Sequence, residues 1–185
     1  SGLQTVVSPA GAAGYWQIMK TTGRENGLEI NSEVDERNHI TKSTEVACRY
    51  LLDAKERLGS WTLAAAAYNM GQSGAERRLV EQKVDSYYDL HLNNETARYV
   101  FRIAAIKYIH EHLEDFGYVF NEDSGYRFPK MDTLTVDTSV SSWIAWAKEH
   151  QSTYQTLRFY NPWIVNDALT SSSNKTYQIW LPSNR

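Results

Sequence analysis

The stretch Ser60-Trp61-Thr62-Leu63-Ala64-Ala65-Ala66-Ala67-Tyr68-Asn69-Met70-Gly71 decides the fold of the first part of the chain. Ser60 can cap the start of a helix over 61–70, because serine accepts a backbone hydrogen bond in the first turn. Gly71 can end it, since glycine readily adopts the left-handed conformation that follows a last turn. The four consecutive alanines leave this helix without bulk on any side. We therefore predict a helix that is buried among other helices.

Helical periodicity continues on both sides of this stretch. Apolar residues at four- and three-residue steps predict one helix over 43–58 and another from Asn94 to about Leu113. Cys48 lies in the first of these helices and is the single cysteine, so an internal disulfide is excluded. We expect a buried structural thiol there rather than a nucleophile. Residues 1–115 show no convincing strand alternation, and the sequence predicts a mainly α domain.

The pattern changes after residue 115. Residues 116–131 are rich in Gly, Asn, Asp, Ser and Pro, which is typical of a linker. Residues 133–137 then alternate like a strand, short helices are predicted over 139–148 and 153–160, and 176–181 form a closing strand. We therefore predict a helical domain at 1–115, a linker at 116–131 and a small α+β module of strand, helix, helix and strand at 132–185.

Composition limits the function. The 185 residues carry a formal charge of -3, whereas a phosphate-binding surface normally shows a basic excess, so nucleic acid is not an expected partner. No apolar run approaches the length of a membrane span. Six Trp and twelve Tyr are many for this length, and although most should pack in the core, flat aromatic faces also suit sugar rings.

Three short segments carry residues suited to binding. Ser8-Pro9-Ala10-Gly11-Ala12-Ala13-Gly14-Tyr15-Trp16-Gln17-Ile18-Met19 is a glycine turn that leads into Gln17, an amide able to donate and accept hydrogen bonds. The second segment is Ala67-Tyr68-Asn69-Met70-Gly71 and the third is Glu95-Thr96-Ala97-Arg98-Tyr99-Val100. Each also has a plain structural interpretation, namely a solvated loop amide, a packed phenol beside a helix end, and an acid favoured by a helix dipole.

Together and in this order, the three segments resemble the motifs of lytic transglycosylases related to goose-type lysozyme. Asp35-Glu36-Arg37 followed by Ser43-Thr44 is similar to a stretch of the membrane-bound D type. The C-terminal module resembles LysM in Trp143-Ile144-Ala145, in Leu157 and Asn161, and in its closing strand. Asp137-Thr138-Ser139 replaces the usual Gly-Asp-Thr, so that sugar binding and a purely structural role both stay open for this module.

The resemblance implies a lysozyme-like helical domain plus a LysM-like module, and an enzyme that cleaves the β-1,4 bond between N-acetylmuramic acid and N-acetylglucosamine without water. By family position, Gln17 and Tyr68 hold the sugar and its acetamido groups, and Asn69 shapes the substrate-binding cleft. Glu95 binds or orients beside them, and Met19 and Tyr99 are supporting wall residues. Ser1 matches the serine of a Glu-Ser motif, so the catalytic glutamate is expected immediately before Ser1, outside this chain. The resemblance implies neither a cofactor nor a metal.

Two alternatives remain open beside the transglycosylase. One is a goose-lysozyme-like muramidase, which hydrolyses the same bond, and the other is a non-catalytic peptidoglycan-binding protein. In each case the expected partner is the glycan strand of peptidoglycan, and the expected protein is a monomer. The expected location is the bacterial cell envelope, in the periplasm or anchored at the outer membrane by a lipid outside this chain. A signal segment is expected to lie outside this chain as well.

Overall fold

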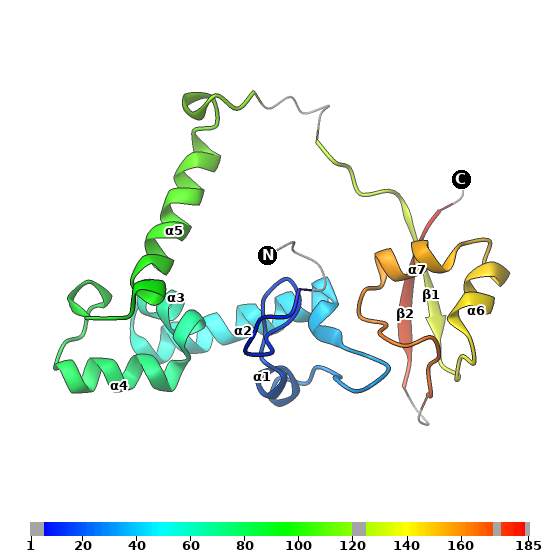
Figure 1. The fold of residues 1–185 in the computed structure, drawn as a ribbon, viewed down its shortest axis with the longest axis horizontal. Coiled ribbons are helices and arrows are strands. Elements are labelled where there is room, and N and C mark those ends of the chain that lie inside the picture. Colours follow the sequence, from blue (N-terminus) through cyan, green and yellow to red (C-terminus); the bar gives the residue numbers. More distant parts are fainter. Residues whose placement is uncertain (1–5, 120–124, 172–174, 184–185) are drawn as a thin grey trace. The chain divides into compact units, whose positions relative to one another are not determined.

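A computed structural model describes residues 6–119, 125–171 and 175–183 (Figure 1). The chain divides into two compact units, and each is described by itself. Unit 1 joins residues 1–47 with 128–185, and unit 2 comprises 48–127. The structure is mostly helical with one small antiparallel sheet, which agrees with the predicted fold class. The two units follow from contacts within the structure. The domain limits predicted from the sequence, at 1–115 and 132–185, stay a prediction.

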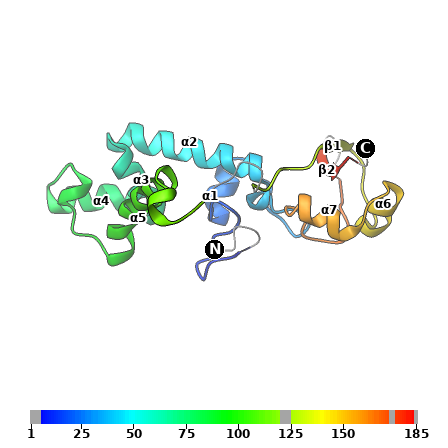
Figure 2. The same ribbon diagram turned by 90° about the horizontal axis from the view of Figure 1, so that it is seen from above.

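The C-terminal part of unit 1 has the predicted order of elements. Strand β1 (Met131–Val136) pairs antiparallel with β2 (Tyr177–Pro182), and α6 (Trp143–Glu149) and α7 (Tyr154–Tyr160) lie between them in sequence. Along β2 the side chains of Tyr177, Ile179 and Leu181 are buried, in strict alternation. Figure 2 shows both helices on the same side of the strands. The buried side chains of β2 form a core with Trp143 and Leu157.

Asn161 closes this core between α7 and β2. Its side chain is fully buried, and its Nδ2 donates to the carbonyl oxygens of Leu157 and Trp180, both at 2.8 Å. Its Oδ1 accepts from the backbone N–H of Trp180 at 2.9 Å. An amide in a core is tolerated only when its groups are satisfied, and here the three bonds fix the end of α7 against the strand.

The N-terminal segment adds a side chain to the same core. Residues 29–36 form a loop that leads into a 3-10 turn at Glu36–Asn38, and Val34 in this loop is completely buried among the apolar residues of the C-terminal module. Two backbone hydrogen bonds join the loop to the C-terminal module. The Asp35 N–H donates to the Trp163 carbonyl, and the Val165 N–H donates to the Glu33 carbonyl. The module core is therefore completed by a residue nearly a hundred positions earlier in the chain.

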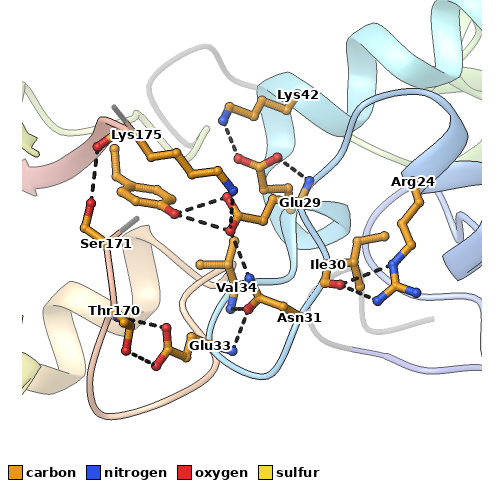
Figure 3. A network of polar contacts seen from close by, with 12 residues as sticks. Arg24, Glu29, Ile30, Asn31, Glu33, Val34, Lys42, Thr170, Ser171 and Lys175 are labelled. Atoms are coloured by element: carbon orange, nitrogen blue, oxygen red, sulfur yellow. Dashed lines mark hydrogen bonds and ion pairs between the residues drawn. The ribbon is translucent and has the colours of Figure 1, made fainter. Parts of the chain in front are cut away.

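Polar contacts surround this insertion (Figure 3). Glu33 accepts from the backbone N–H and the hydroxyl of Thr170, at 2.8 and 2.9 Å. Glu29 accepts from the Tyr177 hydroxyl at 3.1 Å and pairs with Lys175 at 2.9 Å. The segment 29–36 is thus held to the C-terminal module by an apolar anchor and by two carboxylates.

Unit 2 is built around the alanine helix. Helix α3 (Trp61–Met70) packs against α4 (Gln72–Gln82) and α5 (Asn94–Glu111), and Figure 1 shows it beside both. Ser60 accepts from the Leu63 N–H, and Gly71 has a φ of 85°, so both predicted helix boundaries are confirmed. Ala64, Ala66 and Ala67 are fully buried. Small side chains let the neighbouring helices approach closely, as the sequence predicts.

Other expectations need correction. Helix α1 (Lys20–Glu25) and α4 were not predicted, because neither carries an apolar stripe, and each buries a single residue, Gly23 and Ala75 respectively. Helix α2 (Ile40–Leu58) begins three residues before the predicted helix. Cys48 is exposed rather than buried, because the buried stripe of this helix runs through Ala47 and Ala54 and Cys48 lies one position off it. Among the described residues, no helix is long and apolar enough to cross a bilayer.

Candidate functional site

The loop that carries Gln17 is a tight backbone structure in unit 1. Short bridges join Val7 to Ala13 and Ala13 to Ile18, and Gly11 and Gly14 both have positive φ. At Gly14 a Cβ atom would lie 1.9 Å from the carbonyl oxygen of Arg37, so only glycine fits. The small residues in this motif therefore serve a close approach of the loop to the 3-10 turn at 36–38.

The side chain of Arg37 is hydrogen-bonded to the loop that carries Gln17. Its guanidinium forms a two-pronged pair with the Asp35 carboxylate, at 2.9 and 2.7 Å. The same group donates to the carbonyl oxygens of Gly11 at 2.8 Å and Ile18 at 3.2 Å. Arg37 is buried, and charge-assisted bonds of this kind are strong and directional. The role of the Asp-x-Arg pair is thus to fix the two ends of the glycine turn.

Gln17 lies at the tip of this turn with φ of 49°, a left-handed conformation that is uncommon for a residue with a side chain. Its Nε2 donates to the carbonyl oxygens of Val6 at 3.0 Å and Gly14 at 2.9 Å. Both amide hydrogens are therefore used within the loop, and Oε1 is the group that could accept from a ligand. A non-glycine residue that is held in a left-handed backbone conformation, as Gln17 is, is typical of functional positions.

Two neighbours of Gln17 have different surroundings. Trp16 donates from Nε1 to the Thr44 hydroxyl at 2.8 Å, and Thr44 donates to the Ile40 carbonyl at 2.6 Å, so the indole is tied to the first turn of α2. Met19 is exposed at the residue that precedes α1. The role of Met19 as a supporting wall residue stays a prediction. Ser1, the other predicted residue of this segment, lies outside the described residues.

The second group of predicted residues lies in unit 2, where α3 ends and α5 begins. Asn69 donates from Nδ2 to Oε1 of Glu95 at 3.1 Å and accepts at Oδ1 from the Thr96 hydroxyl at 2.8 Å. Asn93 caps α5 by accepting from the Thr96 N–H at 2.9 Å. Residues 26 positions apart are thus brought into one polar cluster. Asn69, Glu95 and Thr96 line a cavity of about 360 Å³, as do Arg77 and Arg78 of α4.

Tyr68 and Tyr99 are half-buried members of the same unit. The Tyr68 ring meets Tyr50 edge-on, with ring centroids 5.5 Å apart, and Tyr50 donates to the Ala67 carbonyl at 3.3 Å. Burial raises the pKa of the Tyr68 phenol well above its usual value, and the nearby phenols of Tyr99 and Tyr50 raise it further. Burial raises the pKa of Tyr99 in the same direction. Both phenols are therefore neutral hydrogen-bonding groups at physiological pH.

The structure places the predicted residues in two sets. Gln17 and Met19 belong to unit 1, and Tyr68, Asn69, Glu95 and Tyr99 belong to unit 2. Asn69 and Glu95 are in direct contact. Sequence reasoning missed Thr96, the buried partner that orients Asn69, and Arg77, which faces the same cavity. Adjacency to Glu95 gave no signal for Thr96, because neighbouring residues on a helix point in different directions and its contact with Asn69 spans 27 residues.

Comparison with known proteins gives the following matches. Residues 1–90 match the family model described as the transglycosylase SLT domain, and residues 132–185 match that of the soluble lytic transglycosylase C-terminal LysM-like domain. The chain is 31% identical over 115 residues to membrane-bound lytic murein transglycosylase D of Escherichia coli strain K12 and, equally, to that of Escherichia coli O6:H1. This covers 60% of the chain but about a quarter of the length of those relatives, 25% in each case.

Proposed function

We propose that this chain is part of a peptidoglycan lytic transglycosylase. Its residues 1–90 match the transglycosylase SLT domain, and its residues 132–185 match the C-terminal LysM-like domain of soluble lytic transglycosylases. The substrate is the β-1,4 bond between N-acetylmuramic acid and N-acetylglucosamine. The product is a 1,6-anhydro end, formed without water. Such an enzyme works on glycan strands in the cell envelope.

The observation that supports this most is the polar cluster of Asn69, Glu95 and Thr96 beside Tyr68. Tyr68 and Asn69 lie at the end of α3, whose alanines 64, 66 and 67 are buried, and Glu95 and Thr96 lie in the first turn of α5, joined to Asn69 by hydrogen bonds. A rigid wall that presents an amide, a phenol and a carboxylate suits the hydroxyl and acetamido groups of a sugar. A catalytic site needs such rigid positioning, since small displacements cost rate steeply.

The reaction assigns distinct tasks to the parts. The glutamate expected before Ser1 donates a proton to the leaving oxygen and then takes one from the 6-hydroxyl of the muramyl ring, which attacks the anomeric carbon. The acetamido group of the substrate assists, as in other glycosidases that work with a single protein carboxylate. Gln17 accepts from the sugar through Oε1, Tyr68 and Asn69 hold the acetamido group, and Glu95 binds the sugar beside Asn69.

The test is digestion of purified murein sacculi by the full-length gene product, with mass analysis of the soluble products. Products lighter by one water than the hydrolytic ones support the proposal. Tyr68→Phe and Asn69→Ala should each lower the rate about 10-fold or more, the loss expected when a hydrogen bond of about 1.4 kcal/mol to the transition state is removed. Tyr88→Phe is the matched control, because Tyr88 is an exposed phenol of the same unit. Hydrolytic products would favour the muramidase instead.

A further inference from the structure

Unit 1 contains a cavity that the proposed reaction does not use. Its volume is about 540 Å³, within the range of about 300–1,000 Å³ that is usual for sites of small organic ligands. Residues between 24 and 42 form one part of its lining, and residues at the start of β2 form the other. The cavity is therefore bordered by the same loop whose Val34 completes the module core, and it lies within one compact unit.

Charged side chains form much of this lining. Three are cations, namely Arg24, Lys42 and Lys175, and two are carboxylates, namely Glu29 and Glu36. Lys42 pairs with Glu36 and Lys175 pairs with Glu29, and in Figure 3 the two lysines extend toward these pairs from different elements. The lining therefore has one positive charge in excess, and the ligand that neutralises it is an anion.

The two carboxylates already have several hydrogen-bond donors. Glu36 is buried, and its oxygens accept from the Glu29 N–H at 2.7 Å and from the ammonium of its lysine partner. Glu29 accepts from Nδ2 of Asn31 at 2.9 Å, from the Tyr177 hydroxyl at 3.1 Å and from its own lysine partner at 2.9 Å. A cationic ligand would have to displace one of these donors, so the carboxylates serve the fold rather than a ligand.

The three cations, in contrast, have donors that the fold does not use. An ammonium has three N–H donors and a guanidinium has five. Among the described residues, each lysine contacts one carboxylate, and Arg24 donates from Nε and Nη2 to the Ile30 carbonyl, at 3.3 and 2.7 Å. The side chains of Lys42 and Lys175 are 47% and 49% exposed, so their ammonium groups can reach a ligand. The unused hydrogen-bonding capacity of the cavity is therefore donor capacity on positive groups.

We propose that this cavity binds a short acidic peptide that carries at least two carboxylates. The cations lie on α1, on α2 and just before β2, so the ligand has to present acceptors at more than one place, and carboxylates are the usual partners of arginine and lysine. Leu28 and Ile30 add apolar surface for the methylene groups of such a ligand. The site belongs to unit 1, whereas the cluster around Asn69 belongs to unit 2, so the inference does not depend on the proposed function.

The test is a calorimetric titration of the chain with the capped dipeptide acetyl-Glu-Glu-amide, which has two carboxylates and no other charge. The capped dipeptide acetyl-Gln-Gln-amide has the same shape without the charges and should bind at least about 10-fold more weakly. Lys175→Gln should weaken binding of the acidic dipeptide about 5-fold, the effect of one unit charge at about 4 Å in water. Lys107→Gln is the matched control, because Lys107 also pairs with a glutamate at the surface but belongs to unit 2.

Glu29→Gln is a second variant, for which the opposite effect is expected. Glutamine keeps the shape and can still accept from the Tyr177 hydroxyl, whereas the excess positive charge of the lining rises. The acidic dipeptide should therefore bind about 5-fold more tightly to this variant. A loss of folding cannot produce tighter binding, so this result separates the charge of the site from damage to the structure.

Three results would overturn the inference. They are equal binding of the two dipeptides, unchanged affinity in Lys175→Gln, and weaker binding in Glu29→Gln. Displacement of the acidic dipeptide by an equal concentration of inorganic phosphate would also contradict it, because the cavity would then attract any anion. Digestion of sacculi is measured separately, so the inference and the proposed function can each fail while the other stands.

Discussion

The backbone of Gly14 lies against the carbonyl of Arg37 so closely that an added Cβ would be 1.9 Å from that oxygen. The contact locks the loop that presents Gln17 onto the 3-10 turn at 36–38. Arg37 completes the lock, because its side chain bonds to the carbonyls at both ends of the loop. The position of Gln17 is therefore set by a steric fit and by a buried charge pair together.

Gly14→Ala should unfold this arrangement. The substitution combines a clash with backbone and a positive φ of 77°, so we expect a loss of unfolding free energy of at least about 3 kcal/mol, at the upper end of the effects of single substitutions. Gly11→Ala is the matched control: its φ is 87° but nothing lies within 4 Å of the added atom, and its loss should be about 1 kcal/mol. Urea denaturation measures both. Equal losses would show that the contact at Gly14 relaxes freely.

Arg37→Lys tests the charge pair. Lysine keeps the charge but cannot form the two-pronged bond to Asp35 while also reaching two carbonyls, so the loop should lose its fixed ends. We expect about 2–4 kcal/mol less unfolding free energy, close to the effect of breaking a buried pair. Arg57→Lys, in an exposed pair with Glu76, is the control and should cost less than about 1 kcal/mol. A similar cost at both positions would contradict the assigned role of Arg37.

Glu95→Gln separates structure from function in the polar cluster. The glutamine can still accept from Asn69 through its oxygen, and Glu95 is exposed, so stability should change by less than about 0.5 kcal/mol. If the carboxylate contacts substrate, the rate of sacculus digestion should still fall, by about 10-fold, which corresponds to a charge-assisted bond. Chemical denaturation and digestion of the same preparation give the two values. An unchanged rate would show that Glu95 only stabilises the start of α5 and does not contact the substrate.

The buried phenol of Tyr177 should make the stability of the protein depend on alkaline pH. Burial, and next the Glu29 carboxylate, raise the pKa of its phenol to about 12 from an ordinary value of 10. Because the folded state holds this proton more tightly than the unfolded state, the contribution is complete below pH 10 and is lost as the pH rises toward 12. Tyr177→Phe should therefore flatten the loss of stability between these values. An alkaline unfolding profile identical to that of the unchanged protein would contradict the Tyr177–Glu29 contact.

The elements that sequence predicted well are those whose signals are local. The alanine helix, its serine cap and its terminal glycine follow from neighbouring residues, and so do α7 and the two strands, although not the antiparallel pairing of those strands. Long-range features were not predictable in this way. Nothing local to Val34 indicates that it enters the core of a module a hundred residues later. Helix α4 likewise has no apolar stripe in its sequence, because Ala75 is the single residue that it buries.

The candidate site likewise combines features that the sequence could predict with features that depend on long-range contacts. Its residue types were suggested by motif, and the contact of Asn69 with Glu95 gives two of them a common location. The supporting residues Arg37 and Thr96 act through bonds to groups that only the fold brings near. The charged cavity of unit 1 could not be foreseen either, since packing and not sequence brings the two ends of the chain together around it.

The most direct test of the central claim is digestion of murein sacculi by the full-length gene product in water enriched in oxygen-18, followed by mass analysis of the new glycan ends. Attack by the substrate's own 6-hydroxyl predicts that the released N-acetylmuramic acid ends contain no heavy oxygen and have lost one water. Ends that carry the heavy isotope in proportion to its enrichment would contradict the account, because water would then be the nucleophile.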